Sequence, residues 1–178
     1  DRGLSILTAA IVVAASEIAG GIVGTLLAGW ATDKFFKSKA HQTCLVGLVG
    51  ATICFAIFWM LPKDATAMTI ISVVMASFFI YMPQALIGIA CSNHATKRVA
   101  ASANGVAGIF GYASTTVSGL AFGLLADNLG WNSVFEVSIA FGVIGIIILA
   151  LIWKAPADGY KKADSILAEL KAEYNVGR

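Results

Sequence analysis

The amino-acid sequence predicts an all-α, polytopic membrane protein. Of its 178 residues, 58% are hydrophobic and only 12% are charged, whereas about 25% of the residues in a soluble domain are charged. Five apolar segments are each long enough to form a transmembrane helix, which needs about 20 residues to cross the hydrocarbon core. None of them alternates apolar and polar residues as a transmembrane β-strand does. We therefore expect five membrane-spanning helices.

The predicted spans follow one another with short loops between them. The first span contains one charged residue, Glu17, the next three contain none, and the fifth contains Glu136 near its start. Several exceed the minimum length, which permits tilting or extension beyond the membrane. The predicted transmembrane part is 1–156, and the predicted tail is 157–178. The five spans are 4–32, 44–61, 65–92, 99–126 and 133–153.

Lysine and arginine residues gather on one side of these spans. The loop 33–43, the loop 93–98 and the tail are basic, whereas the opposite side has only Arg2 and Lys63. Because basic residues accumulate in cytoplasmic loops, we expect the carboxyl terminus inside and the amino terminus outside. The basic residues on the expected cytoplasmic side are Lys34, Lys37, Lys39, Lys97, Arg98, Lys154, Lys161, Lys162, Lys171 and Arg178.

The tail contains an amphipathic pattern. After Pro156, the residues Ile166, Leu167, Leu170 and Tyr174 recur at helical spacing, with lysine and glutamate between them. Two interpretations fit this pattern. One is a short helix that rests on the membrane surface or on the loops, and the other is a solvated, partly disordered terminus.

Motifs of enzymes and of nucleic-acid-binding proteins are absent from the sequence. It has no zinc-type His/Cys spacing, no G-x-S-x-G and no P-loop, and its net charge is only +2. We therefore expect no catalytic activity, no cofactor, no metal and no nucleic-acid partner. The two histidines, His41 and His94, are expected to be solvated in cytoplasmic loops. The cysteines Cys44, Cys54 and Cys91 are interpreted as small buried hydrophobic residues.

Glu17 lies midway along the first predicted span, where an acidic residue costs at least about 2.5 kcal/mol. In an α-helix it would share a face with Gly20, Gly21 and Gly24. Either a structural salt bridge or hydrogen-bonded protonated carboxyl, or a role in transport, would explain an acid at this depth.

Several glycines have the spacing that lets membrane helices approach closely. We expect all of them to lie in helix–helix contacts. They are Gly20 with Gly24, Gly119 with Gly123, and the series Gly105, Gly108 and Gly111.

Tyrosine side chains occur within two of the spans. Tyr81 and Gln84 lie one turn apart around Pro83, which disturbs the helix, and Tyr112 shares a face with Thr115. A tyrosine hydroxyl at this depth requires a hydrogen-bond acceptor. Bonding between helices and binding of a ligand explain it equally well. Arginine, the usual ligand of a buried phosphate, is absent from the spans.

The loop segment GWATDKFFKSK resembles the loop signature of the major facilitator superfamily. Gly29, Asp33, Lys34 and Lys37 match that signature, whereas Phe36 stands where a glycine is usual. A carboxylate is stabilised near the amino-terminal end of a helix. We therefore expect Asp33 to dock at the start of the span 99–126 and to stabilise one conformation.

Three ordered runs resemble a narrower family, the bacterial organophosphate:inorganic phosphate antiporters, which include glycerol-3-phosphate and hexose-phosphate transporters. The runs are SEIAGGIVGTLLAGWATDKFF, FFIYMPQALIG and ATKRVAASANGVAGIFGY. The resemblance implies that the five spans match helices 8–12 of a twelve-helix fold made of two halves around a central cavity. It also implies that the chain is a piece of a longer polypeptide, and that the arginines binding the anion lie outside it.

The same resemblance implies a function and a site. Glu17, Tyr81, Gln84 and Tyr112 would line the cavity, where the tyrosine hydroxyls donate to phosphate oxygens and Glu17 pairs with a cation in the empty state. The implied function is exchange of an organic phosphate for inorganic phosphate by alternating access, in a bacterial inner membrane. Two alternatives remain, a membrane sensor of hexose phosphate with the same fold and a facilitator for another small solute. The chain by itself is expected not to transport.

Overall fold

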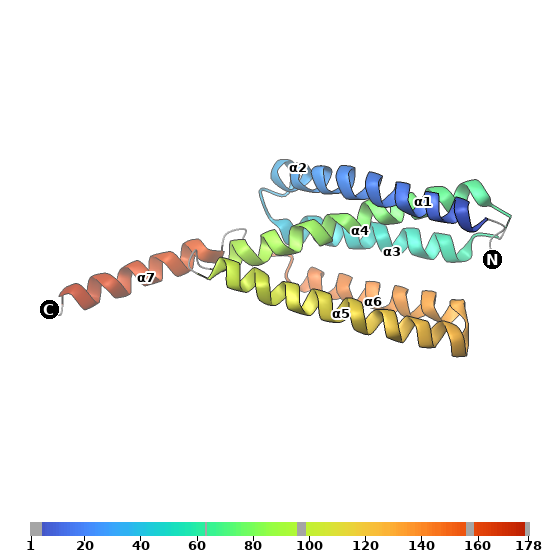
Figure 1. Cartoon of the computed structure of the whole chain (residues 1–178). Coiled ribbons are helices and arrows are strands. Elements are labelled where there is room, and N and C mark those ends of the chain that lie inside the picture. The colour runs from blue at the N-terminus through green and yellow to red at the C-terminus, as the bar shows by residue number, and fades with distance from the viewer. Residues whose placement is uncertain (1–4, 63, 96–98, 156–158, 177–178) are drawn as a thin grey trace.

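The structure is a computed structural model that describes residues 5–62, 64–95, 99–155 and 159–176 (Figure 1). In these ranges every regular element is a helix. A π-helical turn, η1, interrupts the first long helix. The elements are α1 (Ile6–Ala19), η1 (Gly20–Gly24), α2 (Thr25–Phe35), α3 (Ala40–Met60), α4 (Thr66–His94), α5 (Ala100–Leu129), α6 (Trp131–Leu151) and α7 (Gly159–Val176).

In the described part of the chain, five helices are long and apolar enough to cross a membrane, and the prediction of an all-α, polytopic membrane protein is confirmed. The first runs without a break from Ile6 to Phe35 through η1, and the others are α3, α4, α5 and α6. A helix of 30 residues, such as α5, is about 45 Å long. Since the hydrocarbon core is about 30 Å thick, the longest helices extend beyond it or tilt.

The helix α4 lies at the centre of the arrangement. It contacts α1, η1, α2, α3 and α5, as well as the start of the tail helix α7. Figure 1 shows α1 and α2 on one side of α3 and α4, with α5 and α6 on the other side. The small core lies between α2, α3 and α4, at the end of the molecule that holds the α2–α3 loop. It consists of Ala28, Ala40, Cys44, Met82 and Leu86.

Glycines decide how closely α4 approaches its neighbours. A Cβ atom at Gly20 would lie 2.8 Å from the Ser77 carbonyl carbon, and one at Gly24 would lie 2.7 Å from the Phe78 carbonyl oxygen. The predicted close packing is therefore confirmed for Gly20 and Gly24. On α3, Gly47 and Gly50 are similarly close to α4, and this close approach was not predicted.

The same prediction is wrong for the glycines of α5 within the described part of the chain. No atom lies within 4 Å of a Cβ atom built at any of them, and α5 has no buried residue. The helix touches only α4 and α6, so most of its surface has no helix beside it. These glycines are Gly105, Gly108, Gly111, Gly119 and Gly123.

The tail forms a helix that points away from the bundle (Figure 1). Its apolar residues Ile166, Leu167, Leu170 and Tyr174 are all exposed, and among the described elements α7 contacts only α4. The helical interpretation of the tail agrees with the structure. The helix does not lie across the α2–α3 loop.

Candidate functional site

Glu17 is exposed in the structure, and η1 is the reason. The expected face with Gly20, Gly21 and Gly24 assumed α-helical spacing throughout, but a π-helical turn accommodates more residues per turn than an α-helix. The helix upstream of η1 is therefore rotated about its axis by the angle of one residue, about 100°. Ser16, which is only 1% exposed, lies on the face of α1 that packs against α4. Glu17, the next residue, lies off that face and is exposed.

A pair of serines joins α1 to α4 at this level. The Ser77 hydroxyl donates to the Ser16 hydroxyl at 3.3 Å, and the Ser16 hydroxyl donates to the Val13 carbonyl at 2.8 Å. This contact was not predicted, because a serine in an apolar run carries no signal of the face that it occupies.

Tyr81 borders the same junction from α4. It is half-buried, and its ring lies 3.6 Å from the position of a Cβ atom at Gly21. Gln84, one turn further along α4, is exposed. Pro83 lies inside α4, and its Cδ atom packs on Gly47 of α3. Tyr81 and Gly21 are therefore neighbours, whereas Gln84 lies on the exposed side of α4.

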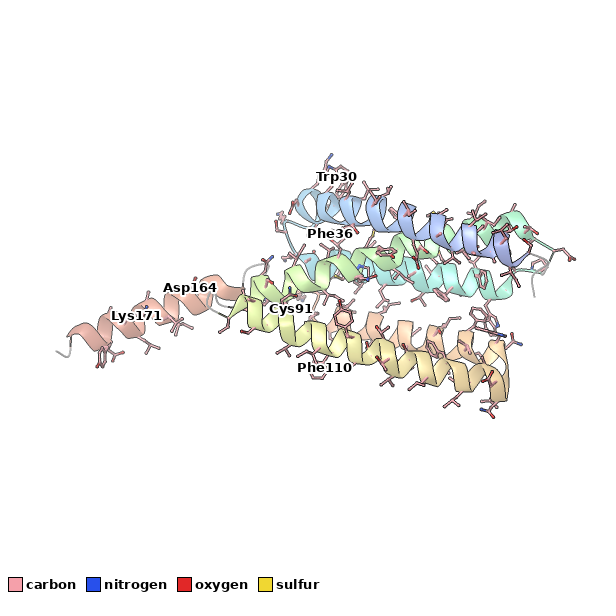
Figure 2. The ribbon with its side chains drawn as sticks, viewed as in Figure 1. Trp30, Phe36, Cys91, Phe110, Asp164 and Lys171 are labelled. Atoms are coloured by element: carbon pink, nitrogen blue, oxygen red, sulfur yellow. The ribbon has the colours of Figure 1, made fainter. Side chains whose placement is uncertain are left out.

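Tyr112 lies on the open surface of α5. It is 81% exposed, and the nearby Thr115 and Thr116 hydroxyls donate to backbone carbonyls of α5 itself. Phe110, labelled in Figure 2, is 72% exposed on the same helix. Because α5 and α1 are not in contact, the described helices do not bring Tyr112 and Glu17 together.

The loop motif lies at the end of α2. Lys37 and Ser38 both have positive φ, at 50° and 63°, and form the turn into α3. Asp33 accepts a hydrogen bond from the Ser38 hydroxyl at 3.1 Å. The Lys34 ammonium group lies 4.7 Å from the centre of the Trp30 ring, within the range of a cation–π interaction.

The expected docking of Asp33 on the start of α5 is not found. Among the described residues α2 makes no contact with α5, since α4 lies between them. Asp33 bonds within its own loop and is exposed, as is Lys37. Gly29, the first residue of the motif, has open space where its Cβ atom would be.

A contact of Trp153, two residues after α6, with the α2–α3 loop and the first turn of α3 was missed at the level of sequence. The Trp153 carbonyl accepts from Gln42 Nε2 at 2.9 Å and from His41 Nε2 at 3.2 Å. The Trp153 ring packs edge-on against Phe36, at 6.5 Å between ring centres. We call His41, Gln42 and Trp153 the loop clamp, because together they join the first turn of α3, directly after the loop, to the segment that follows α6.

The prediction of solvated loop histidines is wrong for His41 and only partly right for His94. His41 is the second residue of α3 and is buried, whereas His94 ends α4 and is exposed. The Trp153 carbonyl lies two residues beyond the end of α6, and its need for a donor explains why a polar side chain is buried there. The cysteines agree with their interpretation in part, since Cys44 is buried and Cys54 and Cys91 are half-buried.

The described helices form an open pocket that is apolar rather than polar. It has a volume of about 280 Å³ and lies between α3, α4 and α6. The predicted site residues do not line it, and its surface offers no charged group to a phosphate. Its lining residues are Phe55, Phe58, Ser72, Val73, Ala76, Ser77, Ile80 and Phe135.

Comparison with known proteins gives one family and a consistent set of relatives. Residues 1–172 match the family model described as Major Facilitator Superfamily. The chain is 34% identical over 138 residues to the glycerol-3-phosphate transporter of Bacillus subtilis, and these residues cover 75% of this chain and 30% of the relative. It is 30% identical over 148 residues to the membrane sensor protein UhpC of Escherichia coli, covering 83% and 34% respectively.

A third relative aligns with a larger share of the chain than these two. The probable hexose phosphate transport protein of Chlamydia trachomatis is 29% identical over 170 residues, which cover 90% of this chain and 35% of the relative. The chain thus spans about a third of the length of the curated relatives that it matches.

Proposed function

The chain belongs to the Major Facilitator Superfamily, and from this membership we propose that it forms part of a transporter that exchanges an organic phosphate for inorganic phosphate. The observation that carries the proposal is the agreement among relatives. Proteins named for glycerol 3-phosphate and hexose phosphate transport align with 75% and 90% of the chain. Exchange would proceed by alternating access, without a catalytic step.

The proposal assigns the five spans to helices 8–12 of a twelve-helix protein. The carboxyl terminus would then lie in the cytoplasm and the amino-terminal end of the chain outside, in a bacterial inner membrane. The gathering of basic residues in the α2–α3 loop and the tail supports this orientation.

The exposed polar residues support a site shared with other parts of the polypeptide. Tyr112, Gln84 and Glu17 are exposed at positions within the spans. An acid facing lipid at this depth would cost at least about 2.5 kcal/mol, so Glu17 is better explained as facing a watery cavity. In that cavity Tyr81 and Tyr112 would donate hydrogen bonds to phosphate oxygens.

The test is exchange of labelled inorganic phosphate in proteoliposomes that hold the longer polypeptide. We expect unlabelled glycerol 3-phosphate or a hexose phosphate to compete for exchange. Tyr112→Phe, which removes only one hydroxyl, is expected to weaken exchange severalfold. The matched control is Tyr174→Phe in α7, which removes the same group outside the spans and is expected to leave exchange unchanged. Exchange that no organic phosphate inhibits would refute the proposal.

A second function is favoured by one relative. The chain aligns over 83% of its length with a protein named as a membrane sensor. A sensor would bind an organic phosphate tightly in the same assay but would exchange little phosphate. Binding without measurable flux would therefore favour the sensor.

A further inference from the structure

The π-helical turn η1 lies directly beside Glu17, in the middle of the first span. A π-helical turn is commonly a single turn inside an α-helix and is often found at a functional site. Here it spans the step from Gly20 to Gly24 and offsets at that step the drift that α-helical geometry adds at the others. The series of buried residues, each four apart, is Ser16, Gly20, Gly24, Ala28 and Thr32. In a continuous α-helix such a series would drift around the axis by about 40° at each step.

We propose that η1 interconverts between π-helical and α-helical hydrogen bonding, and that this exchange replaces Ser16 by Glu17 opposite Ser77. If η1 becomes α-helical, the helix upstream of it turns by about 100° and moves about 1.5 Å along its axis. Each residue of α1 then takes the place of the residue before it. The Glu17 carboxyl comes to the position where Ser16 now meets the Ser77 hydroxyl.

The double glycine permits both arrangements. The place occupied by Gly20 admits no side chain, since a Cβ atom there would lie 2.8 Å from the Ser77 backbone. In the α-helical form Gly21 occupies this place, and it also has no side chain. Gly24 lies at the end of η1 and keeps its contact with α4 in both forms.

The rest of the molecule opposes the movement little. Besides η1, the helix α1 contacts only α4 among the described elements. The half that stays in place, α2, is anchored by Ala28, which is 0% exposed, and by Thr32, whose hydroxyl donates to the Thr43 hydroxyl at 2.8 Å. The change from the π-helical to the α-helical form therefore moves Glu17 without moving the loop motif. A role of this change in transport rests on the proposed function, whereas the change itself does not.

Disulfide cross-linking can measure the two forms. In the longer polypeptide with its native cysteines replaced by alanine, one variant carries Ser16→Cys with Ser77→Cys, and a second carries Glu17→Cys with Ser77→Cys. The first pair reports the π-helical form and the second reports the α-helical form. A third pair, Thr52→Cys with Gly142→Cys, reports folding of α3 against α6, because a Cβ atom at Gly142 would lie 3.4 Å from the Thr52 Cβ atom.

Two matched substitutions bias the equilibrium in opposite directions. Gly20→Ala places a methyl group against the Ser77 backbone only in the π-helical form. Gly21→Ala is tolerated in that form, where the added Cβ atom lies 3.6 Å from the Tyr81 ring, but it clashes in the α-helical form. We expect Gly20→Ala to raise the Glu17–Ser77 cross-linking rate about tenfold relative to the Ser16–Ser77 rate, and Gly21→Ala to lower it by a similar factor.

Two results would overturn the proposal. One is a Gly20→Ala variant that forms the control cross-link and loses the Ser16–Ser77 cross-link, but gains none between Glu17 and Ser77. If Gly20→Ala does not fold, the decision rests on Gly21→Ala. An equal Glu17–Ser77 rate with and without Gly21→Ala would then show that the α-helical form is not populated.

Discussion

The loop clamp predicts a measurable redundancy in stability. The Trp153 carbonyl accepts two hydrogen bonds, from Gln42 and from His41, and either bond alone keeps the carbonyl satisfied. One neutral hydrogen bond contributes about 0.5–1.5 kcal/mol, whereas a buried acceptor left without a partner costs about 1–3 kcal/mol. We therefore expect Gln42→Leu or His41→Phe to destabilise the protein by about 0.5–1 kcal/mol each, and the double variant by about 2–3 kcal/mol.

The loss of stability in the double variant beyond the sum of the two single losses is the coupling energy between the two donors. It can be measured by unfolding the purified protein in detergent and comparing the two single variants with the double variant. Cys44, which is buried two residues beyond Gln42, serves as a local probe once Cys54 and Cys91 are replaced by serine. A loss of 2 kcal/mol corresponds to an increase of about 30-fold in the population of the locally open form, and thus in the rate of thiol labelling.

A control and a refuting result complete this test. Gln84→Leu makes the same side-chain change at an exposed residue of α4, so we expect it to change neither the stability nor the labelling of Cys44. If the double variant loses only the sum of the two single losses, and Cys44 stays protected, the two donors do not share the Trp153 carbonyl.

Three further predictions concern other parts of the chain. Gly24→Ala places a Cβ atom 2.7 Å from a carbonyl oxygen and should destabilise the protein by about 1–3 kcal/mol. The control Gly29→Ala lies in open space and should be neutral or slightly stabilising. Unfolding midpoints in detergent measure both changes. Lys37→Gly should stabilise the protein by about 1 kcal/mol, because φ is 50° at this residue, and Lys37→Val should destabilise it. A lower unfolding midpoint for Lys37→Gly than for the unchanged protein would contradict this prediction. Glu17→Gln should change the rate or the phosphate affinity of exchange severalfold in proteoliposomes, whereas Glu136→Gln should not; equal effects would argue against a role for Glu17.

The membrane-spanning helices could be predicted because their signal is contained in the sequence. A run of about 20 apolar residues is stable in a bilayer only as a helix, since every backbone group must be satisfied within the segment. The first and fourth helices continue a few residues beyond the predicted ends, to Phe35 and Leu129. Helix ends are set by local capping and turns, such as the one at Lys37 and Ser38, and hydropathy does not report them.

The faces of the helices could be predicted only in part. Gly20 and Gly24 pack as their spacing indicates, whereas the same kind of spacing on α5 leaves Gly108 in open space. Spacing shows that a helix has a face of small residues, but not whether a neighbour covers that face. The α5 glycines therefore tell us about the chemistry of the face and nothing about its partner.

By itself, the sequence determined the number and the chemistry of the spans, the basic side of the protein, and the loop motif from Gly29 to Lys37. Only the tertiary structure decided that η1 interrupts the first span, that Ser16 faces α4 where Glu17 was expected, and that His41 is buried against the Trp153 carbonyl just beyond α6. The physical reason is the range of the interactions. Hydrophobicity and charge act residue by residue along the chain, whereas a π-helical turn and a buried hydrogen bond depend on a neighbouring helix that lies many residues away.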